Sequence, residues 1–282
     1  MSTEELSAIR KRIAATRQLE TVFTAMRGVA AARCREAQLS LEGVRAYAGA
    51  VGESIQLALA LSPDEPTARR APTKRIVLAF CSEQGFAGAF DERVLTVATS
   101  LSHDAVLYIV GQRGLSSAIE RGLTVAWSTP MGAHAVDAPS VAERIADALF
   151  DEVVANVTTQ VAVVHATPSS PSDYEIVARS LIPLDLARFP IVEHGGPPIL
   201  NLSPPALLSL LAEEYVFAEL CEAALLSFAS ENGARMQAMT SARSNVRNTL
   251  DELTARHRRS RQEKITEELV ELSRTAADFS KK

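Results

Sequence analysis

The chain has 282 residues, of which 47% are hydrophobic and 5% aromatic, and its formal net charge is −5 at pH 7. This length allows one large domain or two ordinary ones, and the hydrophobic content is enough for a packed core. The negative net charge argues against a chain that binds polyanions over its whole surface. The few aromatic residues argue against an aromatic-rich barrel.

A long helix is predicted at the start of the chain, over residues 2–61. Apolar residues recur there in steps of three and four, as the seam of a coiled coil requires. They are Leu6, Ile9, Ile13, Phe23, Ala30, Cys34, Ala37, Leu41, Val44, Ala48, Val51 and Ile55. Thr16, Glu20 and Arg27 interrupt this stripe, so the seam is expected to be imperfect near that end. The helix is expected to end at Ser62-Pro63, where a proline-containing linker begins.

A second long helix is predicted at the other end of the chain, from Ala206 to about Asp278. Its apolar positions include Leu211, Leu225, Met236, Met239, Val246, Leu250, Leu253, Ile265, Leu269 and Leu272. The most apolar part, Ala206 to Ala229, contains four glutamates and is therefore a poor candidate for a membrane span. Because the two helices lie at opposite ends of the sequence, antiparallel pairing is expected.

Between the helices the pattern changes to short apolar runs of the kind found in buried parallel strands. Strands are expected at Arg75–Cys81, Ala105–Val110, Thr124–Ser128, Gln160–Ala166 and Ile176–Leu184. Helical stretches follow the first two strands, and another helix is expected from Ser140 to about Ala155. Such alternation predicts an α/β layer.

The predicted fold class is therefore α/β. A Rossmann-like central domain, residues 74–198, is expected together with a long antiparallel two-helix coiled coil. The coiled coil is formed by the N-terminal helix, residues 1–61, and the C-terminal helix, residues 204–282.

One glycine-rich loop, Cys81 to Phe90, follows a strand and precedes a helix. This is where α/β folds bind phosphates. However, the loop matches neither GxGxxG nor GxxxxGK[ST], and it has no lysine for a phosphate. A tight structural turn is the favoured interpretation, and Gly111 and Gly114 after the second strand are weaker candidates still.

No catalytic, cofactor-binding or metal site is expected in this chain. The five histidines, His103, His134, His165, His194 and His257, show no ligand spacing. Nothing in the sequence brings Asp173, Glu175 and Asp185 together, and Met236 and Met239 fit the helix seam better than a ligand pair.

The three cysteines, Cys34, Cys81 and Cys221, are far apart and odd in number, which favours a reducing compartment. The first residues are charged and lack the apolar core of a secretory signal. A soluble protein of the cytoplasm is therefore expected.

The clearest charge cluster is the run Arg256 to Arg261, here called the basic collar. It is either a solvated helix face paired with nearby glutamates, namely Glu252, Glu263, Glu267 and Glu268, or a contact surface for an acidic partner. The sequence leaves these two interpretations open. Nucleic acid is not expected as the partner, because no aromatic residues are interleaved with the arginines and both helices carry many carboxylates.

Both ends of the chain resemble the gamma subunit of F-type ATP synthases. The family typically reads IRxRIxSVxNTxKITKAMxMVAAsK near its N-terminus, and this chain reads IRKRIAATRQLETVFTAMRGVAAARCR from Ile9 to Arg35. The family's ASExxARMxAMxxAxxN is matched at Ala229 to Asn245, and its ARQxxITxEL is matched from Ser260 to Leu269. The family's central SDRGLCGxxN appears loosely at Ser82 to Asp91.

The resemblance implies the subunit of the central stalk that rotates inside a hexamer of alpha and beta subunits, with no active site of its own. It implies that the central domain and the adjoining helix ends bind the epsilon subunit and the ring of c subunits. Contact with the membrane would be made only through the complex, as a peripheral protein on the cytoplasmic side of the cell membrane. The residues expected at the hexamer are Arg33, Arg256, Arg258, Arg259, Arg261, Gln262, Thr266 and Glu268.

The chain also departs from the family pattern. Its NTxKIT segment is replaced by Gln18 to Phe23, and the central loop lacks the usual Asp, Arg and Cys, as expected for a divergent or alternative branch of F-type ATPases. Two other classes stay open: a coiled-coil scaffold without a rotary role, and an α/β protein that binds a small molecule and carries helical arms.

Overall fold

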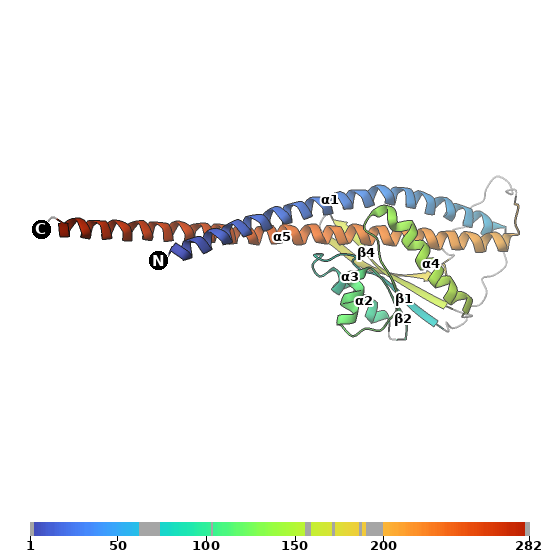
Figure 1. Cartoon of the computed structure of the whole chain (residues 1–282). Coiled ribbons are helices and arrows are strands. Elements are labelled where there is room, and N and C mark those ends of the chain that lie inside the picture. The colour runs from blue at the N-terminus through green and yellow to red at the C-terminus, as the bar shows by residue number, and fades with distance from the viewer. Residues whose placement is uncertain are drawn as a thin grey trace. The chain divides into compact units, whose positions relative to one another are not determined.

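A computed structural model describes residues 3–61, 74–102, 104–155, 159–170, 173–185, 188–189 and 200–279. Two long helices, α1 (Thr3–Ala60) and α5 (Pro204–Phe279), are the first and last elements along the chain (Figure 1). The chain divides into two compact units. The first, here the helical unit, combines Met1–Val29 with Gln237–Lys282, and the second, here the central unit, is Ala30–Met236.

The predicted three-part division into residues 1–61, 74–198 and 204–282 stays a prediction, because each compact unit takes in part of both long helices. The predicted linker after Ser62 and the predicted end of the central domain near residue 198 lie outside the described residues.

In the helical unit, α1 and α5 pair in antiparallel fashion. Arg10 contacts His257, and ten residues later along α1 Glu20 contacts Arg247, ten residues earlier along α5. In this unit the apolar stripe of α1, namely Leu6, Ile9, Ile13 and Phe23, is partly buried, as the spacing predicts.

Of the three polar residues that interrupt the stripe, Thr16 and Glu20 lie within the seam and Arg27 is exposed. Thr16 is buried, and its hydroxyl donates to the carbonyl oxygen of Arg12. Glu20 reaches Nε of Arg247 at 2.7 Å and Nε of Arg243 at 3.5 Å. The hydrogen bond from Arg247 lowers the pKa of the Glu20 carboxyl. The segment that departs from the family pattern thus places an ion-pair triad in the part of the seam that was expected to be imperfect.

The last apolar positions of α5 are exposed, which corrects the expected seam. The exposed fractions are 45% for Ile265, 61% for Leu269 and 67% for Leu272. In the antiparallel register set by Arg10 and His257, Thr3 at the start of α1 falls opposite about residue 264. Helix α5 therefore runs past Thr3, the first described residue of α1, and no described residue of α1 lies opposite its apolar side chains there.

The central unit contains a five-stranded sheet in the order β3-β2-β1-β4-β5. Its strands are β1 (Lys74–Phe80), β2 (Val106–Val110), β3 (Val125–Thr129), β4 (Thr159–Ser170) and β5 (Asp173–Ile182). The first four strands are parallel, and β5 runs antiparallel to β4. Only a short link joins β4 to β5. A link of this length can join antiparallel strands, whereas parallel strands need a longer crossover connection.

All five predicted strands are present, but the edge of the sheet differs from the prediction. Strand β4 extends to Ser170, and β5 begins at Asp173, three residues before the predicted start. Strand β5 ends before Pro183, which has no backbone N–H with which to continue the ladder. The exposed end of this β4–β5 hairpin is polar, so apolar runs alone do not reveal it.

Helices cover both faces of the sheet (Figure 1). Helices α2 (Phe90–Leu101) and α3 (Gln112–Glu120) pack on one face. On the other face lie the 3₁₀ turn η1 (Ala135–Asp137), α4 (Ala138–Ala155) and the part of α5 in this unit, with α1 beyond it. Alternate residues of β1 divide between the two cores: Ile76 and Leu78 face α4 and α5, and Val77 faces α2.

The segment of α5 from Tyr215 to Arg235 is buried on nearly all sides. Its apolar side chains, Val216, Leu220, Ala224, Leu225 and Phe228, join the core formed with the sheet and α4. This burial accounts for the apolar stretch seen in the sequence, because a helix that is apolar all round lies inside a protein core or a membrane. Within the part of the chain that the structure describes, no helix is long and apolar enough to cross a membrane.

Gly114 brings α3 into direct contact with the end of β1. A Cβ atom at this position would lie 1.9 Å from Cβ of Cys81. We expect Gly114→Ala to destabilise the central unit by about 1–3 kcal/mol through overpacking. Gly43→Ala on an exposed face of α1 is the matched control, because a Cβ there meets nothing within 4 Å, and it should stabilise by about 1 kcal/mol. Urea unfolding measures both, and equal effects would contradict the packing argument.

His165 on β4 is buried with Nε2 unpartnered among the described residues. Burial, assisted by the charge of Arg179, lowers its pKa to about 4. The unfolded chain, with a histidine pKa of about 6.5, therefore binds more protons, and stability falls as the pH drops below about 6.5, by about 2 kcal/mol at pH 5.

The variant His165→Asn keeps a polar atom near Nδ1 but takes up no proton. We expect it to remove this part of the pH dependence when unfolding free energies at pH 7 and pH 5 are compared. An unchanged difference between the two pH values would show that His165 is not responsible.

Candidate partner interface

The basic collar lies on α5 within the helical unit, and its arginines point outward. Arg256, Arg258, Arg259 and Arg261 are all exposed. Between them, His257 is partly buried and Ser260 is almost fully buried, so the inner side of the same turns faces α1. Nε of Arg10 donates to Nε2 of His257 at 3.1 Å and holds this side in place. The arginines therefore stay on the outer side of the helix pair.

The ion pairs of α5 bear on both interpretations of the collar, as a solvated helix face and as a partner surface. Among the described side chains, no ion pair joins any of its four arginines to a carboxylate. Glu268, one of the glutamates expected to neutralise the collar, instead faces Nζ of Lys264 at 3.8 Å. The collar is therefore a set of exposed positive charges, which is the property that a surface for an acidic partner needs.

Gln262, Thr266 and Glu268 follow the collar on the next turns of α5. All three are exposed, and the Thr266 hydroxyl donates to the carbonyl oxygen of Gln262 at 3.0 Å. These residues and the four arginines thus form one stretch of about four helical turns. Apolar Ile265 and Leu269 are exposed in the same stretch, so this surface offers a partner both charge and apolar area.

Arg33, the remaining predicted contact residue, belongs to the central unit. Its Nη1 donates to Oε1 of Gln84 at 2.9 Å, so it contacts the glycine-rich loop. Its side chain is only partly buried. The structure thus gives Arg33 an internal contact that the sequence did not predict.

The glycine-rich loop is a structural turn rather than a phosphate cradle, as favoured from the sequence. The carboxylate of Asp91 accepts from the backbone N–H of Ser82 at 2.7 Å, and Glu231 accepts from those of Glu83 and Gln84, each at 3.2 Å. Three successive amide groups are therefore already bound to carboxylates. An incoming phosphate would have to displace them and approach negative charge.

Gly111 after β2 is likewise explained by close packing. Its φ is +110°, and a Cβ there would lie 2.6 Å from the carbonyl oxygens of Cys81 and Ser82. Only glycine permits this backbone conformation at this distance, so neither this position nor Gly114 needs a ligand to account for it.

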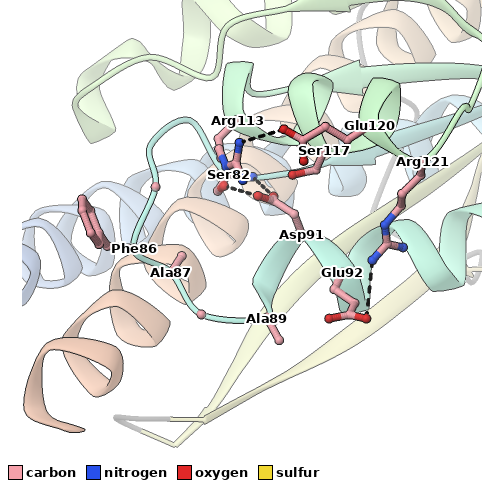
Figure 2. A pocket seen from close by; sticks show the side chains of 12 residues that line it. Ser82, Phe86, Ala87, Ala89, Asp91, Glu92, Arg113, Ser117, Glu120 and Arg121 are labelled. Carbon is pink, nitrogen blue, oxygen red and sulfur yellow. Dashed lines mark hydrogen bonds and ion pairs between the residues drawn. The ribbon is translucent and has the colours of Figure 1, made fainter. Parts of the chain in front are cut away.

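A cavity of about 470 Å³ lies between the glycine-rich loop, α2 and α3. Figure 2 shows that its arginines already face carboxylates: Arg113 lies 3.6 Å from Glu120, and Arg121 lies 3.6 Å from Glu92. Burial raises the pKa of Asp91, although Ser82 donates to it. Negative groups in the lining outnumber positive ones, so the cavity does not favour a phosphate ligand.

Metal ligands, cysteines and methionines can be located only in the described part of the chain. There, no group of three or more His, Cys, Asp or Glu residues has the geometry of a metal site. The three cysteines are free thiols, and Cys81 and Cys221 are buried. Met239 is buried in the helix seam, as its spacing predicts.

The sequence matches the family model described as ATP synthase over residues 5–277. The ATP synthase gamma chain of Chlorobium luteolum is 30% identical over 281 residues, covering 95% of this chain and 96% of that relative. The chain belongs to the family of ATP synthase gamma chains. The gamma chain of Thermobifida fusca is 26% identical over 289 residues, covering 95% of this chain and 94% of the relative.

Solved structures share the fold of this chain. A chain in a cryo-EM structure of the Euglena gracilis mitochondrial ATP synthase, described as OSCP/F1/c-ring, has a TM-score of 0.65 at 13% identity, covering 99% of this chain and 95% of its own length. A chain of the Tetrahymena thermophila central stalk and c-ring has a TM-score of 0.58 at 20% identity, covering 78% and 99%. At these identities the likeness concerns the fold.

Sequence reasoning missed Glu231 and Arg235, which hold the glycine-rich loop. Both lie in the segment Ala229 to Asn245 that matches the family motif, and both are almost fully buried. The signal was available, because two charged residues four positions apart stand in an otherwise apolar and small-residue stretch. The sequence could not show that the groups bound by this pair come from a loop 150 residues away.

Replacing all four collar arginines by glutamine should change the free energy of unfolding by less than about 0.5 kcal/mol, because none of them has a carboxylate partner among the described residues. Glu20→Gln is the contrasting variant: it removes the negative charge that pairs with Arg243 and Arg247 and should lower stability. Urea unfolding of the full chain compares the two. A collar variant less stable than Glu20→Gln would mean that the arginines serve the fold instead of a partner.

Proposed function

We propose that the chain is the central-stalk rotor of an F-type ATP synthase, coupling rotation of a membrane ring of c subunits to ATP synthesis or hydrolysis in a hexamer of alpha and beta subunits. The observation that carries this proposal is the family match over residues 5–277, which takes in both long helices and the sheet. Relatives of the same fold support it, since they are described as central stalk with c-ring and as a rotor.

The helical unit is the part proposed to enter the hexamer. Its collar places exposed positive charge on the helix pair, and the adjoining end of α5 exposes Ile265, Leu269 and Leu272. Exposed apolar side chains that lie together mark a surface for a partner, whose binding would remove them from water. The proposed contacts in this unit are Arg256, Arg258, Arg259, Arg261, Gln262, Thr266 and Glu268, and Arg33 of the central unit is proposed as a further contact.

The proposed mechanism is mechanical, and the chain itself supplies no catalytic group. A ligand or partner shifts a conformational equilibrium only through different interaction free energies with the two states. Because the collar occupies one stretch of α5, the three beta subunits around it would meet different faces of the helix pair at any moment. Rotation would then favour each catalytic site in turn. Exposed ion pairs contribute only about 0.2–1 kcal/mol each. A single ion pair with the hexamer can therefore break and re-form with another partner, while the ion pairs together keep the collar bound.

The central unit is proposed to bind the epsilon subunit and the c-ring. The chain is a peripheral part of a membrane complex, and we place it on the cytoplasmic side of the cell membrane. The reducing compartment inferred from three free cysteines supports that side.

Reconstitution with the cognate alpha and beta subunits tests the proposal. We expect a stable complex whose steady ATP hydrolysis depends on this chain and falls when Arg261 to Lys282 are deleted. Arg113→Gln, which changes the exposed cavity of the central unit, is the control and should leave hydrolysis unchanged. A hexamer that turns over equally well without the chain, or that never binds it, would refute the rotor assignment.

A further inference from the structure

Two buried side chains of α5 hold the backbone of the glycine-rich loop. The carboxylate of Glu231 accepts hydrogen bonds from the N–H groups of Glu83 and Gln84. Arg235, one helical turn later, donates from Nη2 to the carbonyl oxygen of Gln84 at 2.7 Å and from Nε to that of Gly85 at 3.0 Å. Two side chains thus bind four backbone groups of three consecutive residues.

Glu231 and Arg235 also bind each other, in addition to the loop. Arg235 also donates to Glu231 and, from Nη1, to Oδ1 of Asn232 at 2.9 Å. Both charged side chains are almost fully excluded from solvent. Buried charges are tolerated when they are paired and hydrogen-bonded in this way. The side chains of the helix and the backbone groups of the loop therefore provide each other's hydrogen-bond partners.

The same loop reaches α1 and two further strand ends. Arg33 of α1 donates to the side chain of Gln84. The side chain of Glu83 accepts from the backbone N–H of Gln112, just after β2, at 3.2 Å, and from that of Met131, just after β3, at 2.7 Å. The loop therefore connects the carboxyl ends of three parallel strands to both long helices within the central unit.

We infer that Glu231 and Arg235 are positioning residues that lock the central sheet to the long helices, so that torque applied to one is passed to the other. The inference rests on the proposed rotor function. Its physical basis is directionality: apolar packing between α5 and the sheet resists separation but is non-directional, whereas hydrogen bonds weaken steeply when their angle changes. The polar joint therefore resists the sliding and twisting that apolar contact permits.

The double variant Glu231→Met with Arg235→Met tests the joint without leaving an unpaired charge. Replacing a buried ion pair by apolar residues of similar volume commonly preserves folding. In the complete membrane complex, reconstituted in vesicles, we expect ATP hydrolysis to continue, while ATP-driven ion transport per ATP hydrolysed falls by about fivefold or more. Unchanged transport per ATP would overturn the inference.

A second variant separates the joint from a simple helix ion pair. Exchanging the residues, Glu231→Arg with Arg235→Glu, keeps an ion pair at the same spacing but offers the wrong groups to the loop. We expect it to be as defective as the first variant, and restored coupling would overturn the inference. Arg45→Met with Glu222→Met removes an ion pair, 2.9 Å long, between exposed Arg45 of α1 and partly buried Glu222 of α5, and should leave coupling unchanged.

Hydrogen exchange on the isolated full chain distinguishes failure of the joint from failure of the rotor assignment. We expect the amides of Glu83 and Gln84 to exchange about fivefold or more faster in the double methionine variant, with the helix content unchanged. Equal exchange in both proteins would show that no joint exists, whatever the complex does. A wild-type chain with slow amides that fails to join the hexamer would instead count against the rotor assignment.

Discussion

Burial of the middle of α5 is the constraint on which the central unit depends. From Tyr215 to Arg235 this helix packs against the sheet and α4 on one side and against α1 on another. A surface helix needs only one apolar stripe, whereas a helix enclosed in this way must be apolar or small on almost every face. This requirement explains the alanine- and leucine-rich sequence of the segment, and it fixes where polar residues are allowed.

The polar residues of that segment serve neighbouring elements. The Ser227 hydroxyl donates to the carbonyl oxygen of Phe80 on β1, and Glu219 lies between Arg179 at 2.6 Å and Arg188 at 3.2 Å. With Glu231 and Arg235 they give α5 specific bonds to β1, β5 and the glycine-rich loop. A buried polar group without a partner is costly, so these residues restrict the helix to one register on the sheet.

Charge is used differently in the two units. In the central unit Glu219, Glu231 and Arg235 of α5 are paired and almost fully buried, whereas on the outer side of the helical unit four arginines remain exposed without a carboxylate partner among the described residues. Paired charges hold an arrangement, and exposed charges remain available to partners that change. This division fits a subunit that must be rigid within itself and exchange its contacts with a surrounding hexamer.

The sequence by itself determined the elements with strong local signals. Apolar residues at steps of three and four predicted both long helices within a few residues, since burial along one face imposes that period. Short apolar runs predicted the parallel strands, because strands covered on both faces must be apolar throughout. The motifs at Ile9 to Arg35 and Ala229 to Asn245 predicted the family.

Only the tertiary structure decided features that depend on residues distant in the chain. Glu20 stays in the helix seam because α5 supplies Arg243 and Arg247 opposite it. Leu269 and Leu272 are exposed because the antiparallel register brings α1 to its start before they are reached. The joint at Glu231 and Arg235 depends on a loop 150 residues away. In each case the side chain's environment is set by a non-local partner, which no local period or propensity specifies.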